Sequence, residues 1–102
     1  MKMITAIVNR KDSDSVCDAL TKGGFIFTKI ATSGGFLKKG NVTLLIGTDI
    51  ARLHEAVGLI RANSASRTET APSFLRMNAE QNNVLVGGAT IFVTDVEYFE
   101  KM

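Results

Sequence analysis

The order in which strand-like and helix-like patterns alternate constrains the fold of this chain more than any other feature. The run MITAIV at 3–8 is apolar and rich in β-branched residues, which predicts a buried strand. Asp12 or Ser13 can then cap a helix that has one apolar face. Gly23 and Gly24 end that helix, because glycine readily takes the left-handed conformation needed just past a helix C-terminus. The chain therefore opens with a strand and a helix.

The middle of the chain predicts a hairpin followed by a second helix. FIFTKIAT at 25–32 and NVTLLIG at 41–47 are rich in β-formers and flank a connection of about eight residues, which is typical of a long-looped hairpin. Asp49 can cap the helix that follows. The apolar stripe of that helix contains Leu53, Ala56, Val57 and Ile60.

The rest of the chain combines a long polar segment with one more strand. Residues 63–83 contain the only proline and show no sustained period, so we expect a long loop with a short strand around SRTET. A connection of this length in a small domain is usually functional or disordered. The run VLVGGATIFVTDVEYF at 84–99 predicts a last strand and a short terminal turn. Its paired glycines suggest a bulge or a close backbone approach inside that strand.

These elements follow the order β-α-β-β-α-β. They predict an α+β, ferredoxin-like subunit with an antiparallel sheet and both helices on one face. The length of 102 residues fits a single domain over residues 1–102. The second face of the sheet needs a cover, and packing it against sister subunits would bury it. The side chains that we expect on that face are Phe25, Phe27, Leu44 and Phe92.

Composition narrows the class of protein. Charged residues make up 22% and apolar residues 45%, the balance of an ordinary soluble domain. The net charge of +2 is too small to argue for a nucleic-acid polymer as partner. A single cysteine, Cys17, rules out an internal disulfide and favours a reducing compartment. The opening run is too short for a signal sequence and no apolar stretch reaches membrane-spanning length, so we expect a cytoplasmic protein with no membrane partner.

Groups suited to catalysis or metal binding are scarce. His54 is the only histidine, and a lone histidine in the middle of a helix is most often a surface residue. Cys17 has no second cysteine or histidine nearby, and the carboxylate of Asp18 disfavours a thiolate. Asp12, Asp14 and Asp18 cluster at the first helix, where carboxylates near the N-terminus complement the helix dipole. We therefore expect no enzyme, no metal and no cofactor.

The segment ATSGGFLKKGN at 31–41 is the strongest candidate for binding. It holds Phe36 and Leu37 among glycines and lysines, although it matches neither common phosphate-loop motif. Glycines allow backbone N–H groups to face an anion, and Lys38 and Lys39 add positive charge. Phe36 can stack on a base. The alternative, equally open on these residues, is that Phe36 and Leu37 fold back onto the domain or fill a subunit interface.

The blocks MKMITAIV, TKIATSGGFLKKGN, NVTLLIG and VGGATIFV together resemble the PII-like cyclic-di-AMP receptor family of the PstA type. The resemblance covers nearly the whole chain and is weakest over 63–83. It implies a ferredoxin-like subunit in a compact homotrimer whose sheets face the centre. It also implies that cyclic di-AMP binds in clefts between adjacent subunits, with the Gly-Gly-Phe-Leu segment around an adenine.

The positions that the resemblance assigns to ligand binding are Thr28, Gly35, Phe36, Leu37, Asn41, Gly47 and Phe92. Each has a plainer explanation as a β-former, a turn residue, a strand end or a core side chain. The chain also departs from the family pattern. Members typically begin the second strand with Asn and then Arg beside the phosphates, where this chain has Gly24 and Ile26. Its loop after the second helix is several residues shorter than in typical members.

The resulting hypothesis is a PII-like signal-transduction protein that binds a cyclic dinucleotide, cyclic di-AMP, between subunits. Binding would switch the loops 33–41 and 63–83 and so regulate an unidentified protein partner. Gly24 and Ile26 leave an alternative open, a PII-like trimer that has lost cyclic-di-AMP binding or binds another nucleotide. An RNA-binding module using Phe25, Phe27 and Phe92 is disfavoured, because the RNA-recognition signature is absent.

Overall fold

Strands and helices alternate along the chain in the order that the sequence predicts, with two additional short strands. The elements are β1 (Lys2–Asn9), α1 (Arg10–Lys22), β2 (Ile26–Ala31), β3 (Asn41–Thr48), the 3₁₀ turn η1 (Ile50–Arg52), α2 (Leu53–Ala62), β4 (Arg67–Thr70), β5 (Asn83–Val86) and β6 (Ala89–Asp95). The computed structural model describes residues 1–31, 40–64, 67–70, 83–86 and 88–102.

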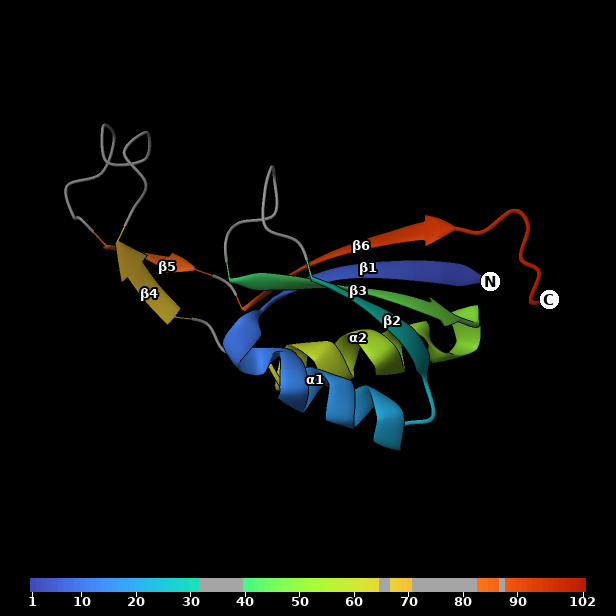
Figure 1. Cartoon of the computed structure of the whole chain (residues 1–102), viewed down its shortest axis with the longest axis horizontal. Helices are drawn as coiled ribbons and strands as arrows, with labels where there is room; N and C mark the ends of the chain where they lie inside the picture. Colours follow the sequence, from blue (N-terminus) through green and yellow to red (C-terminus); the bar gives the residue numbers. More distant parts are fainter. Residues whose placement is uncertain (32–39, 65–66, 71–82, 87) are drawn as a thin grey trace.

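Four of the strands form one antiparallel sheet in the order β2-β3-β1-β6, and both α-helices cover the same face of it (Figure 1). The arrangement is that of a ferredoxin-like α+β fold, as predicted. The short strands β4 and β5 form a separate two-stranded sheet, drawn at the left of Figure 1. We refer to the sheet face that the helices leave uncovered as the open face.

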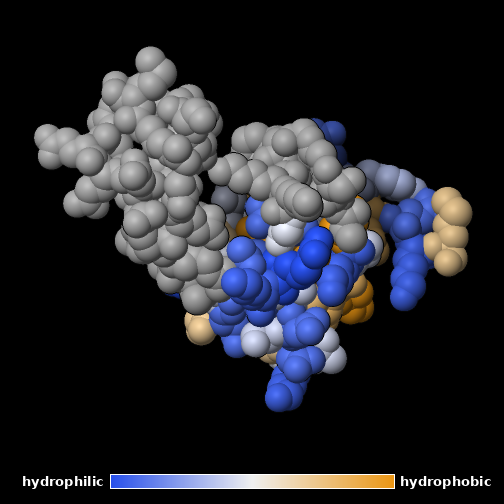
Figure 2. Space-filling view, turned by 60° about the vertical axis from the view of Figure 1, so that its left-hand side comes forward, coloured by the Kyte–Doolittle hydropathy of each residue, from blue (hydrophilic) through white to orange (hydrophobic). Residues whose placement is uncertain are grey.

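The core lies between the main sheet and the helices. Alternate residues of β1 and β3 are buried there, as the two-residue repeat of a strand requires. The buried apolar side chains are Ile4, Ala6, Val8, Val16, Leu20, Phe25, Val42, Leu44, Ile46, Ala56 and Ile60. Full burial of one such aliphatic side chain contributes about 1.5–3 kcal/mol. Where Figure 2 shows described residues, their surface is largely hydrophilic, with smaller hydrophobic areas.

Helix α1 begins earlier than the sequence suggested. Asn9, the last residue of β1, is its N-cap and accepts a hydrogen bond on Oδ1 from the backbone N–H of Lys11 at 2.9 Å. Asp12 and Ser13 are therefore buried within the first turns of the helix and do not cap it. The predicted end is confirmed, because Gly24 has a φ of +81°, a conformation that side chains disfavour.

The expected occupants of the open face are mostly wrong. Phe25 and Leu44 are buried in the core, and Phe27 packs against it. The cause is register, because Phe27 pairs with Ile46, a core residue, and this directs both side chains towards the helices. Of the four residues predicted for the open face, Phe92 lies there.

The last predicted strand is in fact two strands in different sheets. β5 pairs with β4, with Arg67 opposite Val86, whereas β6 pairs with β1. The chain therefore passes from one sheet to the other between Val86 and Ala89, and the bulge or close approach predicted at the paired glycines involves Gly87, which lies outside the described residues. The strand expected around SRTET is confirmed as β4. Past Asp95 the chain has a bend at Glu97 where the sequence predicted a short terminal turn.

The predicted stripe of the second helix is confirmed by Ala56 and Ile60, which are fully buried. We expect Ile60→Ala to lower the free energy of unfolding by about 2–5 kcal/mol, because it leaves a cavity in the core. The same substitution at Ile50, which is 68% exposed in η1, should change it by less than about 0.5 kcal/mol. Urea denaturation of both variants tests this, and equal effects would contradict the core assignment.

Two glycines with opposite backbone requirements give a second test. Gly24→Ala should lower the free energy of unfolding by about 1 kcal/mol, because an alanine is strained at the positive φ of this position. The added Cβ makes only an ordinary van der Waals contact, so no clash contributes. Gly58 lies inside α2 with open space around it, so Gly58→Ala should raise stability by about 1 kcal/mol. Thermal unfolding of the two variants measures whether each substitution lowers or raises stability. A stabilising Gly24→Ala would exclude the strained turn.

Candidate functional site

The predicted ligand positions that the structure describes all lie on the open face. Residues directly opposite each other in an antiparallel pair share a face. Thr28 is opposite Leu45, Leu45 is opposite Thr5, and Thr5 is opposite Phe92, so these four form one row across the sheet. Asn41 and Gly47 lie on the same face of β3, at even spacing from Leu45. Register alone therefore brings Thr28, Asn41, Gly47 and Phe92 to one surface.

These positions are spread across the whole face. Thr28 and Phe92 stand on opposite edge strands, three strand spacings or about 14 Å apart. Asn41 and Gly47 are six residues apart on β3, which is about 20 Å along the strand. A site that uses all four must therefore be an extended surface and not a single pocket of one subunit.

The open face carries no charge at the positions that the structure describes. Its side chains, assigned from the register, are Met3, Thr5, Ile7, Asn9, Ile26, Thr28, Ile30, Asn41, Thr43, Leu45, Gly47, Thr90, Phe92 and Thr94. Ile26 and Phe92 are 79% and 48% exposed. A neutral, partly apolar face of this kind suits an aromatic base or another protein surface better than it suits water.

The segment that carries the remaining candidates begins and ends beside this face. Gly35, Phe36 and Leu37 lie outside the described residues. At the base of their segment, Gly40 has a φ of +92° and its carbonyl oxygen accepts a hydrogen bond from the backbone N–H of Arg10 at 2.7 Å. Asn41, next in the chain, pairs with Asn9. The start of α1 thus fixes one end of the candidate binding segment.

At the opposite end of the sheet, Arg52 connects the segment between α1 and β2 to the start of α2. Its Nη2 donates to the carbonyl oxygen of Gly23 at 2.6 Å and to Glu55 Oε2 at 2.8 Å, and its guanidinium stacks over Phe25, 4.1 Å from the ring centroid. The hydrogen bond between Arg52 and Glu55 raises the pKa of the guanidinium and lowers that of the carboxyl. These contacts of Arg52 connect the turn at Gly24, which precedes Ile26, to the start of α2.

Sequence reasoning did not single out Arg52. The one available signal was its spacing of three residues from Glu55, which suits a helical ion pair. The hydrogen bond to Gly23 and the contact with Phe25 join segments far apart in the chain. Nothing in the local pattern announces them.

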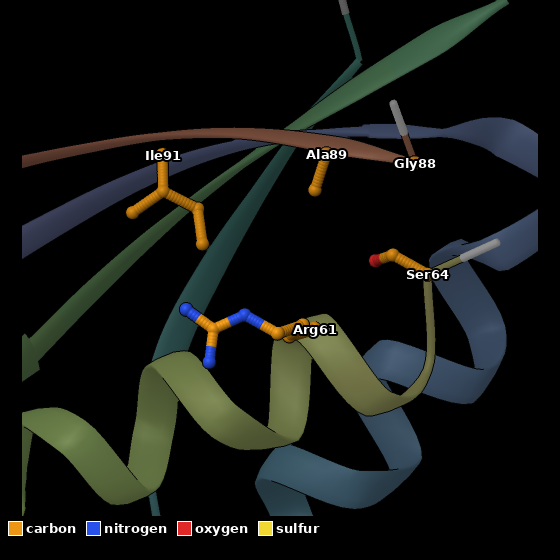
Figure 3. A pocket seen from close by; sticks show the side chains of 5 residues that line it. All are labelled: Arg61, Ser64, Gly88, Ala89 and Ile91. Carbon is orange, nitrogen blue, oxygen red and sulfur yellow. The ribbon is translucent and has the colours of Figure 1, made fainter. Parts of the chain in front are cut away.

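A cavity of about 260 Å³ opens between the end of α2 and the start of β6 (Figure 3). Arg61, Ser64, Gly88, Ala89 and Ile91 line it, so it contains none of the predicted ligand positions. Its volume is below the about 300–1,000 Å³ of typical small-molecule pockets. The candidate site is therefore the open face and not this cavity.

Two side chains considered for chemistry, His54 and Cys17, lie among the described residues. His54 is exposed, as predicted. Burial raises the pKa of the Cys17 thiol, and Asp14 and Asp18 raise it further while Lys29 opposes them. Among the described residues, no three His, Cys, Asp or Glu side chains come together as a metal site would require. Neither described helix is long and apolar enough to span a bilayer.

Comparisons with known proteins bear on the fold and on the family of the chain. A crystal structure of a protein of unknown function from Pediococcus pentosaceus ATCC 25745 superposes with a TM-score of 0.74 and is 35% identical in sequence, and the match covers 99% of this chain and 96% of the other. The sequence profile of the family described as "Cyclic-di-AMP receptor" matches residues 1–102, the full length of the chain. The chain therefore belongs to the cyclic-di-AMP receptor family.

Proposed function

We propose that this protein is a non-enzymatic receptor that binds cyclic di-AMP in clefts between the subunits of a homotrimer. The observation that carries the proposal is the common location of Thr28, Asn41, Gly47 and Phe92 on one open face whose described positions carry no charge. The family match over residues 1–102 supports the choice of ligand. A ligand with two bases can use a site that extends over the distances between these positions.

The open face also supports the assembly. A sheet face with exposed Ile26 and Phe92 gains stability when a second surface covers it. Clefts between subunits would then bring positions from the two edges of neighbouring sheets towards one ligand. In this proposal Phe36 and Leu37 close on an adenine, and the segments 33–41 and 63–83 change conformation on binding. The ligand must favour one of the two conformations for a protein partner to sense it.

A calorimetric titration with cyclic di-AMP tests the ligand. We expect measurable binding by the wild type and an affinity at least about fivefold weaker for Phe36→Ala, because stacking on a base is worth about 1–3 kcal/mol. Ile50→Ala, which removes an exposed side chain of η1, outside the strands that form the open face, is the control and should bind as the wild type does. No heat at high micromolar ligand, or binding indifferent to Phe36, contradicts the proposal.

A second candidate function is a trimeric partner-binding protein that no longer binds cyclic di-AMP or binds another nucleotide. The observation that favours it is Ile26, an apolar side chain that is 79% exposed at the position where the resemblance implies a phosphate-binding arginine. No charged group replaces it on the described open face. This candidate predicts a wild-type protein without affinity for cyclic di-AMP.

Ile26→Arg tests whether the site lacks a phosphate-binding side chain at this position. We expect this variant to bind cyclic di-AMP about tenfold or more tightly than the wild type, because a charge-assisted hydrogen bond to phosphate contributes about 1.5–3 kcal/mol. Ile30→Arg places the same charge on the same strand and face, near its other end, and should gain less. Binding that is present only in Ile26→Arg would support the second candidate. Equal gains in both variants would show a general effect of charge.

A further inference from the structure

One side chain of the open face is buried and carries an unused hydroxyl. Thr43 on β3 is 7% exposed, and its Oγ1 has no hydrogen-bond partner among the residues that the structure describes. Thr48, a second buried threonine of the same strand, donates from Oγ1 to the carbonyl oxygen of Asp49 at 3.2 Å. Buried hydroxyls in folded proteins are nearly always paired, so the unpaired one needs an explanation.

Thr43 stands between two of the predicted ligand positions. Asn41 lies two residues before it on β3, about 7 Å away along the same face. Thr28 is its diagonal neighbour on β2, since Thr28 is opposite Leu45 and Thr43 is opposite Ile30. Diagonal positions of this kind are about 7–8 Å apart. The unpaired hydroxyl therefore lies in the floor of the candidate site and not at its margin.

The surroundings of the hydroxyl select the kind of group that can pair with it. Its neighbours in the row across the sheet are Ile30 on β2 and Ile7 on β1, both apolar. A phosphate would lose its water beside them without a charged partner, which is costly. The edge of an adenine carries an amino donor and ring-nitrogen acceptors, and a hydroxyl can serve either. Oγ1 itself has less than 1 Å² of accessible surface, so a base reaches it only when the groups that cover it move aside.

We propose that the Thr43 hydroxyl hydrogen-bonds the edge of an adenine of the bound cyclic dinucleotide. The inference rests on the proposed function and adds a residue to the site that the resemblance does not assign. In the free protein the hydroxyl has given up water without gaining a partner, which lowers stability. In the complex the base satisfies it. The same group therefore weakens the free protein and strengthens the complex.

Thr43→Val tests both halves of this statement, because valine keeps the shape and removes the hydroxyl. Without ligand, the midpoint of thermal unfolding should be unchanged or raised, by up to about 4 °C. Calorimetric titration with cyclic di-AMP should show an affinity about tenfold weaker than that of the wild type. Thr43→Ser, which keeps the hydroxyl, should bind within about threefold of the wild type. The matched control Thr48→Val loses a made hydrogen bond, so it should lower the midpoint and leave the affinity unchanged.

Two results overturn the inference alone. One is a wild type that binds together with a Thr43→Val variant of equal affinity. The other is a lowered unfolding midpoint for Thr43→Val, whatever its affinity, because the hydroxyl then has a partner in the free protein. A wild type that gives no binding heat overturns the proposed function and this inference with it.

Discussion

The pairing of β1 with β3 is the interaction on which the rest of the structure depends. It runs from Lys2 opposite Thr48 to Asn9 opposite Asn41, through the middle of the sheet. A slip of one residue would place Ile4 opposite Leu45 and not Ile46, so the apolar residues of the two strands would face opposite sides of the sheet. The pairing also places Asn9 where it caps α1, and it sets Gly40 beside Arg10. One register thus defines the core, the start of a helix and one end of the candidate binding segment.

The order and type of the main elements could be predicted because they depend on local patterns. β-branched runs, a helical stripe at Ala56 and Ile60, and glycines at the end of α1 each act within a few residues. The assignment of faces failed where apolar residues occur on both sides of a strand. In β2, Ile26 and Ile30 point one way and Phe27 the other, so hydrophobicity could not say which side meets the helices. Pairing with β3 decides it.

The start of α1 and the split between β5 and β6 were missed for a related reason. Asn9, Asp12 and Ser13 are all good N-cap residues, and the choice among them depends on where β1 stops pairing. Likewise β5 and β6 are continuous in sequence pattern but pair with different partners. In both cases the local sequence allows several cap positions or strand pairings, and contacts between distant segments select one of them.

The candidate site was foreseen only in part. The resemblance supplied Thr28, Asn41, Gly47 and Phe92, and the register explains why residues so scattered in the chain share one face. Arg52 and Thr43 carry no such mark. The importance of Arg52 comes from its bonds across the chain, and that of Thr43 from a hydrogen bond that is not made. Neither a bond to a distant residue nor a bond that is not made can be inferred from the type of a residue or from its spacing along the chain.

The neutrality of the open face has a consequence for symmetry. When identical copies meet around a rotation axis, each charged group on the shared surface is brought near its own duplicates, and like charges repel. A face made of threonine, isoleucine and asparagine side chains avoids this self-repulsion, so association through it would respond little to ionic strength. The two negative charges of a cyclic dinucleotide would then meet no charged side chain at the described positions of this face. Such an assembly would therefore respond to the charge of the bound ligand more than to the ionic strength of the solution.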